Sequence, residues 1–363
     1  MPISRIKLGT KTGMVDTRQP IEDIIMTKPK APKGLRVSDV DSSSCKIHWL
    51  HPEKHHSCLK SYQIKIRSSD KKFSHDVTPL RHVKTWPIRH GMLQQAQDYD
   101  ITVTTLCVRD QITTESEESK ISFTTLPESI KNLKLESSTP NSLTVKWDIP
   151  IVTNGIKYVL AINANTSEDD EADDDDEEEV TKIKDFEVKN IEVSADKSQY
   201  TFNDLPKIIG TGHAYDISVV TVYTSPREIE SKSKECKDRF MTRPLPPTKL
   251  AVGDKDKPLQ ITWHKSVTPN VVGYKVRWKP MNVEDANNTN LVKTDEATIS
   301  DVDPEQDQII FSFPPGRVQA AQVYKVNVYA FAESANLSSE SKELHEKFLV
   351  QNESEIIVYV ENE

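Results

Sequence analysis

One short segment of the chain gathers side chains that bind transition metals. His51, His55, His56 and Cys58 lie together, and imidazole and thiolate are the ligands that zinc prefers. A structural zinc site usually shows two tight ligand pairs at fixed spacing, whereas this segment offers one loose cluster and no second pair follows it. We therefore expect a polar exposed loop here and no metal site.

A run of acidic side chains at residues 168–179 is a candidate for binding calcium or a basic partner. It holds eleven carboxylates and no basic residue. High-affinity calcium loops place oxygen ligands at fixed intervals around a glycine turn, and this run has neither feature. Because like charges repel and remain hydrated, we expect a solvated loop. The formal net charge is −9, and the eleven carboxylates of this run account for all of it, so the rest of the chain is close to balanced. No long basic run is present, so nucleic acid is not an expected partner.

Signatures of catalysis are missing from the sequence. It contains no glycine-rich phosphate loop, no G-x-S-x-G elbow and no H-E-x-x-H pair. The carboxylates are concentrated in the acidic run and are not placed as an acid–base pair. We therefore predict a protein that is not an enzyme, with no catalytic residue and no cofactor.

The compartment of the protein is left open by its hydrophobic pattern. No stretch approaches the roughly 18–20 apolar residues that span a membrane as a helix. The N-terminus carries Arg5, Lys7 and Lys11 without an apolar segment, so it is not a secretory signal peptide. Either the protein stays inside the cell, or the chain is a fragment whose leader lies upstream and whose membrane tether lies in parts not present.

An internal repeat organises most of the chain. Three copies begin alike, at Pro32–Leu35, Ile130–Leu133 and Pro247–Leu250. About fourteen residues after each of these leucines an alternating segment carries a tryptophan, at Trp49, Trp147 and Trp263. A second alternating segment then contains Tyr62, Tyr158 or Tyr274. Each copy ends with an apolar residue six positions before another tyrosine, at Tyr99, Tyr215 and Tyr324.

Alternation with a period of two predicts half-buried β-strands, and two packed sheets need large side chains at their centre. The tryptophans fit that centre, and the late tyrosines fit a tyrosine corner, in which the hydroxyl bonds to nearby backbone. This order of residues resembles the fibronectin type III family over residues 27–350. The resemblance implies an all-β, immunoglobulin-like fold of three tandem seven-stranded antiparallel β-sandwiches in an elongated array.

Proline-rich junctions at residues 126–127 and 244–247 mark the boundaries between the copies. We expect five segments along the chain. They are a flexible arm at 1–26, a first domain at 27–126, a second at 127–243 with the acidic insertion at 168–179, a third at 244–350, and a tail at 351–363. Residues 355–360 alternate like a strand, which either extends the last sheet or begins a further domain.

The topology that the resemblance implies also brings two of the four cysteines together. The loop after the second strand and the loop after the sixth lie at one end of such a sandwich, so Cys58 and Cys107 could approach and form a disulfide. Cys45 alternates inward with Ile47 and is expected to be buried, and Cys236 is alone in the second copy. With few cysteines the chain is no disulfide scaffold.

Asparagine sequons for N-glycosylation occur at Asn165, Asn287, Asn336 and Asn352, which favours an extracellular origin. By resemblance, such modules act in cell-adhesion molecules and receptor ectodomains, and bind other proteins through exposed loops or sheet faces. We expect the contact loops to be residues 51–59, 108–118, 223–231 and 332–338. The preferred interpretation is a non-catalytic binding and spacer array from an extracellular or membrane-tethered adhesion or receptor glycoprotein.

Two alternatives remain for the function. The first is an intracellular structural or scaffolding protein that uses the modules as spacers, which the missing leader and the unpaired cysteines favour. The second is a regulatory or carbohydrate-side appendage of an enzyme whose catalytic part lies outside this chain.

Overall fold

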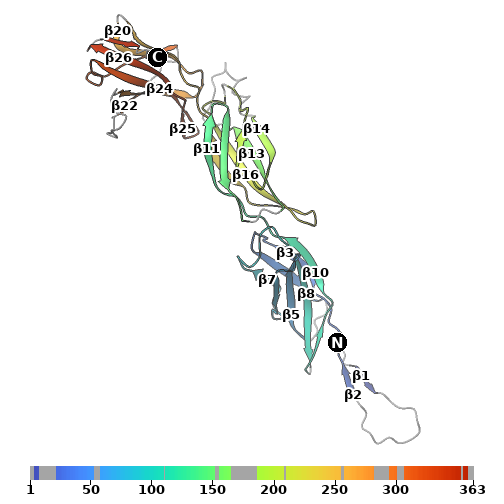
Figure 1. The fold of residues 1–363 in the computed structure, drawn as a ribbon. Coiled ribbons are helices and arrows are strands. Elements are labelled where there is room, and N and C mark those ends of the chain that lie inside the picture. Colours follow the sequence, from blue (N-terminus) through green and yellow to red (C-terminus); the bar gives the residue numbers. More distant parts are fainter. Residues whose placement is uncertain are drawn as a thin grey trace, which may run out of the picture. The chain divides into compact units, whose positions relative to one another are not determined.

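The computed structural model describes most of the chain as antiparallel β-strands (Figure 1). The described residues are 4–7, 22–52, 58–109, 111–151, 155–164, 186–207, 210–254, 257–281, 294–300, 306–352 and 355–358. By their contacts they divide into two compact units. The first comprises Met1–Ser129, Pro150–Lys157 and Val220–Lys234; the second comprises Ile130–Ile149, Tyr158–Val219 and Glu235–Glu363.

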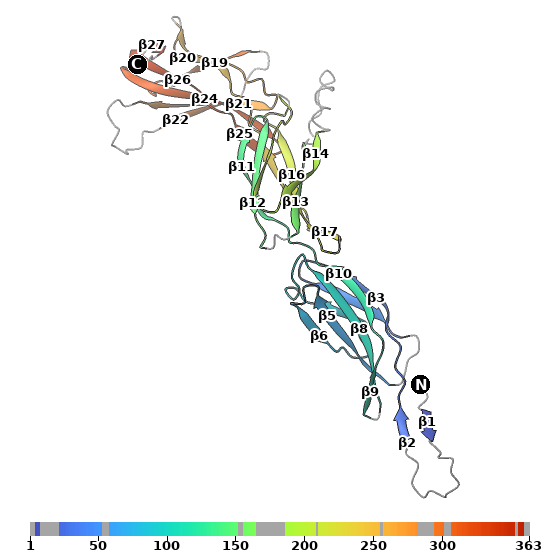
Figure 2. The ribbon, with the colours of Figure 1, turned by 45° about the vertical axis from the view of Figure 1, so that its right-hand side comes forward.

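The first sandwich is built from two sheets. One has the strand order β3-β4-β7, with β3 at Lys33–Ser38, β4 at Cys45–Leu50 and β7 at Thr85–Ile88. The other has the order β10-β8-β5-β6, seen side by side in Figure 2, with β9 also paired to β8. Its strands are β5 (Leu59–Ser68), β6 (Ser74–Val77), β8 (Asp98–Arg109), β9 (Ile112–Glu115) and β10 (Ser119–Thr124).

The second sandwich repeats this strand order, with sheets β11-β12-β15 and β14-β13-β16, and with β17 and β18 paired to β16. Its strands are β11 (Lys131–Thr139), β12 (Ser142–Asp148), β13 (Ile156–Ala164), β14 (Glu187–Ser194), β15 (Gln199–Phe202), β16 (Ala214–Thr224), β17 (Glu230–Lys232) and β18 (Cys236–Met241).

The third sandwich has sheets β19-β20-β23 and β22-β21-β24-β26-β27, with β25 paired to β24. Its strands are β19 (Thr248–Asp254), β20 (Lys257–His264), β21 (Val271–Pro280), β22 (Asp295–Ile299), β23 (Gln308–Ser312), β24 (Gln322–Ser334), β25 (Leu337–Glu340), β26 (Leu344–Asn352) and β27 (Glu355–Val358). The all-β prediction of three sandwiches is therefore confirmed. The last strand of each sandwich is divided into two segments, which the sequence pattern did not predict.

Alternating side chains explain why these segments form strands. In β4, Cys45, Ile47 and Trp49 are buried while the residues between them are more exposed, as a strand with one face on a core requires. Trp49 comes from one sheet and Tyr62 from the other, and their rings meet edge to face with centroids 5.3 Å apart. The same pair recurs as Trp147–Tyr158 at 5.4 Å and Trp263–Tyr274 at 5.6 Å.

The late tyrosines form the expected corners. The backbone N–H of Gln94 donates to Tyr99 Oη at 2.8 Å, and that of Gln319 donates to Tyr324 Oη at 2.9 Å. In the second sandwich the polarity is reversed, and Tyr215 Oη donates to the carbonyl of Gly210 at 3.3 Å. The reason is local, since the N–H of Gly210 already donates to the carbonyl of Pro206.

The N-terminal segment contains regular structure that its sequence did not indicate. β1 (Ser4–Lys7) and β2 (Glu22–Ile25) pair within the segment that we expected to be a flexible arm. β27 pairs with β26, so residues 355–358 extend the last sheet. Of the two alternatives for residues 355–360, the extension of the last sheet is therefore the one observed, whereas β1 and β2, with four residues each, are too short for alternation to distinguish them from loops.

Trp263→Ala is expected to unfold the third sandwich preferentially. The Trp263 side chain is fully buried, and removing a buried indole costs roughly 3–5 kcal/mol. Differential scanning calorimetry of the full chain should show one transition shifted to lower temperature while the transition of the first sandwich stays in place. A common downward shift of all transitions would show that the sandwiches do not have separate cores.

Candidate functional site

A disulfide links two strands at one end of the first sandwich. Cys58, just before β5, is bonded to Cys107 in β8, with Cα atoms 4.8 Å apart. Cys107 is buried and pairs across the sheet with Leu59. The bond therefore connects the segment after β4 to the strand that leads into the β8–β9 turn. The expected contact loops at residues 51–59 and 108–118 are linked covalently through it.

His51, from the expected loop at 51–59, is engaged with the core. Its ring stacks on Tyr62 with centroids 5.9 Å apart, and its Nδ1 forms a hydrogen bond with Tyr62 Oη. Burial raises the pKa of the Tyr62 hydroxyl. His55 and His56 lie outside the described residues, as does the acidic run at 168–179. In the part of the chain that the structure describes, no three acidic, histidine or cysteine side chains gather around a metal-sized space.

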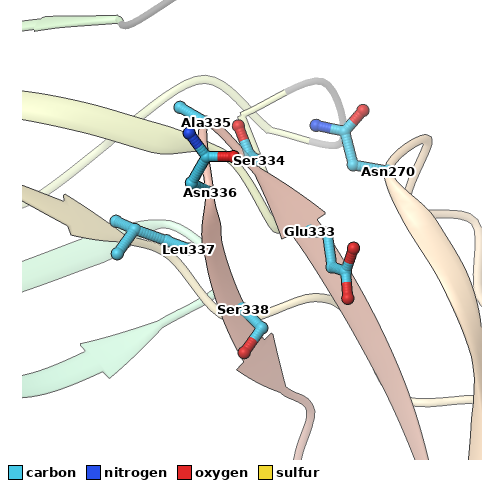
Figure 3. Close-up of a pocket in the computed structure, with 7 residues that line it drawn as sticks. All are labelled: Asn270, Glu333, Ser334, Ala335, Asn336, Leu337 and Ser338. Atoms are coloured by element: carbon cyan, nitrogen blue, oxygen red, sulfur yellow. The ribbon is translucent and has the colours of Figure 1, made fainter.

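The turn between β24 and β25 borders an open pocket with a volume of about 440 Å³. Figure 3 shows its side chains coming from the end of β24, the turn, the start of β25 and the loop before β21. They are Asn270, Glu333, Ser334, Ala335, Asn336, Leu337 and Ser338. The lining is mostly polar, with amides, hydroxyls and one carboxylate beside the apolar Ala335 and Leu337, which suits binding to a polar surface.

Two of these residues also hold a turn of the second sandwich, within the same compact unit. The backbone N–H of Ala214 donates to Ser334 Oγ at 3.2 Å, and Asn270 Nδ2 donates to the carbonyl of Gly212 at 3.4 Å. The expected contact loop at 332–338 is therefore partly engaged inside the chain.

The sequon asparagine Asn336 lies at the tip of this turn. Ala335 and Asn336 both have positive φ, at 47° and 64°, as a tight hairpin turn requires. Asn336 is exposed. Of the other three sequon residues, Asn165 and Asn287 lie outside the described residues, and Asn352 is the last residue of β26.

A charged and aromatic cluster covers the outer sheet face of the third sandwich. Arg277 on β21 donates to both carboxylate oxygens of Glu340, at 2.9 and 3.0 Å, and to Glu296. Its guanidinium lies 4.7 Å from the ring centre of Tyr329, and Lys275 Nζ lies 2.6 Å from Glu340 Oε1. The cluster joins residues of four strands, β21, β22, β24 and β25, and the sequence analysis did not identify it.

The two cysteines outside the disulfide are poor nucleophiles. Cys45 is buried in the first core, and burial raises the pKa of its thiol to about 12. Cys236, at the start of β18, is half-buried, and burial followed by the nearby Asp238 raises its pKa. Thiols of raised pKa react slowly because the thiolate is the reactive form.

The remaining expected contact loops lie in the first compact unit. Residues 108–118 include the β8–β9 turn, and Thr114–Glu118 line an open groove of about 520 Å³ with Lys28 and Lys120. Residues 223–231 form the β16–β17 hairpin, whose Arg227 contacts Asp100.

The described part of the chain contains no helix long and apolar enough to cross a bilayer.

Residues 30–123 match the Fibronectin type III domain family. Among solved structures, a two-domain fibronectin type III segment of chicken tenascin is 17% identical, covers 59% of this chain and 100% of its own, and has a TM-score of 0.40. The FN1–FN3 domains of chicken CNTN1 are 12% identical and cover 88% of this chain and 99% of their own, with a TM-score of 0.28.

Reduction of the disulfide is expected to destabilise the first sandwich by roughly 2–4 kcal/mol, because the bond closes a long loop in the unfolded chain. Urea denaturation with and without reductant would measure this for the wild type, and Cys58→Ser with Cys107→Ser should reproduce the reduced value. Cys236→Ser is the matched control and should leave the midpoint unchanged. Equal midpoints with and without reductant would contradict the stabilising role.

The stability of the third sandwich is expected to fall in acid through Glu340. Burial alone raises the pKa of this carboxyl, but hydrogen bonds from Arg277 and Lys275 outweigh it and lower the pKa. A carboxyl with a lowered folded pKa contributes stability above its unfolded pKa and loses it as the pH falls through the folded value. The melting temperature of Glu340→Gln should therefore fall less steeply than that of the wild type as the pH is lowered below about 4.3.

Glu343→Gln is the control for this effect. Glu343 lies on the same face, but its distance to Lys325 Nζ is 3.8 Å, longer than the distances from Glu340 to Arg277 and Lys275. Parallel pH profiles for wild type and Glu340→Gln would show that the Arg277 cluster does not contribute.

Proposed function

We propose that this chain, which contains a fibronectin type III domain at residues 30–123 followed by two sandwiches of the same strand order, is a protein-binding and spacer array of an extracellular or cell-surface protein. Its work is adhesion or receptor recognition and not catalysis. Domains of this family are generally structural or binding modules, and their contacts are made by loops and sheet faces on a rigid framework.

The observation that carries the extracellular assignment is the Cys58–Cys107 disulfide. Disulfides persist in oxidising compartments and are rare in the cytosol. The two free thiols do not argue against this, because burial raises the pKa of both Cys45 and Cys236 and makes them slow to oxidise. The exposed sequon residue Asn336, on a tight turn, adds a site that a glycosyl transferase can reach.

The contact surfaces we propose are the disulfide-braced end of the first sandwich and the outer sheet face of the third. The first carries the β8–β9 turn on a covalently fixed base. The second presents Tyr329 and Phe331 beneath the cations of Arg277 and Lys275, and aromatic residues and arginine are enriched in protein interfaces. The partner is another protein.

A cytoplasmic scaffold is the second candidate, because the free thiols of Cys45 and Cys236 are equally compatible with a reducing compartment. In that compartment all four cysteines would be reduced and the sandwiches would serve as spacers. The two candidates differ in covalent chemistry that is directly measurable.

Intact mass of the protein from its native source, before and after N-glycosidase treatment, tests the assignment. Denatured protein labelled with a thiol reagent should take up two labels without reductant, at Cys45 and Cys236, and four with it. Glycosidase should lower the mass. Ser338→Ala should remove the glycan at Asn336, whereas Ser339→Ala, outside the sequon, should not. Four labels without reductant and an unchanged mass would replace the extracellular assignment with the scaffold.

A further inference from the structure

Two aspartates at the start of β8 form a carboxylate site on the first sandwich. Asp98 and Asp100 pair across the sheet with Thr124 and Ser122 of β10. Thr124 Oγ1 donates to Asp98 Oδ1 at 2.6 Å, and Ser122 Oγ donates to Asp100 Oδ1 at 2.6 Å. Asp98 is only 1% exposed, and its Oδ2 accepts no hydrogen bond. A buried carboxylate oxygen without such a partner requires a cation nearby.

That cation is Arg227, from the β16–β17 hairpin in the same compact unit. Its Nη2 donates to both carboxylate oxygens of Asp100 at 3.0 Å. Its Nε lies 3.8 Å from Asp98 Oδ2. One guanidinium therefore contacts both carboxylates. It can do so because it presents several N–H donors in one plane, whereas the ammonium of a lysine is a single point charge.

The hairpin fixes the position of this arginine. Ser225 is buried, and its Oγ accepts hydrogen bonds from the backbone N–H groups of Arg227 and Ile229, at 3.1 and 3.3 Å. At the base of the hairpin, Gly155 has φ +72°, and an added Cβ would lie 3.0 Å from the Tyr223 ring. The ring can lie against the backbone here because the residue is a glycine.

The equivalent positions in the other sandwiches show that the site is specific to the first. Asp216 follows the corner tyrosine Tyr215 as Asp100 follows Tyr99, but it is neutralised by its own sandwich, through Arg239 at 2.9 Å and Lys237 at 3.0 Å on β18. In the third sandwich this position is Lys325.

We propose that Asp98 and Asp100 form a recognition site for an arginine presented on a β-hairpin, and that Arg227 determines the docking of residues 225–232 on the first sandwich. Two neutral contacts accompany it, from Ser231 Oγ to the carbonyl of Thr125 at 3.4 Å and from Ser129 Oγ to that of Lys234 at 2.7 Å. The arginine supplies the charge dependence and the selectivity. This holds in either compartment, so it is independent of the proposed function.

Hydrogen–deuterium exchange of the full chain tests the proposal on the hairpin amides. Arg227→Ala and Asp100→Asn should each raise exchange of residues 225–232 by about tenfold, in line with a partly buried charge pair. Arg227→Lys should recover only part of the protection, and the double variant should exchange no faster than either single one, because both changes remove one interaction. Raising the salt from about 0.05 M to about 0.5 M should speed exchange in the wild type and not in Arg227→Ala.

Arg239→Ala is the matched control, since it breaks an arginine–aspartate pair at the equivalent position inside the second sandwich. It should leave hairpin exchange unchanged. The proposal is overturned if Arg227→Ala exchanges like the wild type, if Arg239→Ala accelerates the hairpin as much, or if Arg227→Lys is fully protected.

Discussion

Each sandwich depends on one edge-to-face contact between a tryptophan of the first sheet and a tyrosine of the second. The three contacts differ by only a few tenths of an ångström, with centroids 5.3–5.6 Å apart. Such ring pairs contribute about 0.5–1.5 kcal/mol beyond the area they bury, and their larger effect is geometric. The indole sets the distance between the two sheets. The neighbouring strands must therefore place their inward side chains in register with it, and this fixes where the loops begin and end.

This dependence explains what the sequence could predict. Trp49, Trp147 and Trp263 follow the leucine that opens each copy at nearly constant spacing, and each corner tyrosine follows an apolar residue by six positions. These local spacings recur because the strands that build the core set them, whereas the loops between the tryptophan and the corner tyrosine differ in length. The end of the sandwich at which Cys58 and Cys107 lie follows from the strand order that the family resemblance implies. Pattern therefore predicts the core, and the resemblance that rests on this pattern predicts the strand order and the place of the candidate disulfide.

The surface chemistry could not be predicted in this way. Alternation marks Arg277, Glu340 and Tyr329 as outward, but their pairing depends on strands far apart in the chain, so no local spacing encodes it. Arg227 and Asp100 are separated by 127 positions and look like ordinary surface charges. The short β1–β2 pair was missed for a different reason, since four-residue strands without a turn signal lie below the resolution of a period-two argument.

The turn that leads into the corner tyrosine Tyr215 both anchors that tyrosine and contacts the third sandwich. In the second unit the turn that anchors Tyr215 also carries Thr211, whose hydroxyl lies 2.8 Å from that of buried Thr268. Gly212 has φ +60° there, and an added Cβ would lie 2.8 Å from that of Ala332. This contact is made of hydroxyls and close packing, which salt hardly affects, whereas the Arg227 contact in the first unit is ionic. Since these residues lie outside the tryptophan–tyrosine core, the strength and salt response of each contact can vary while the fold stays the same.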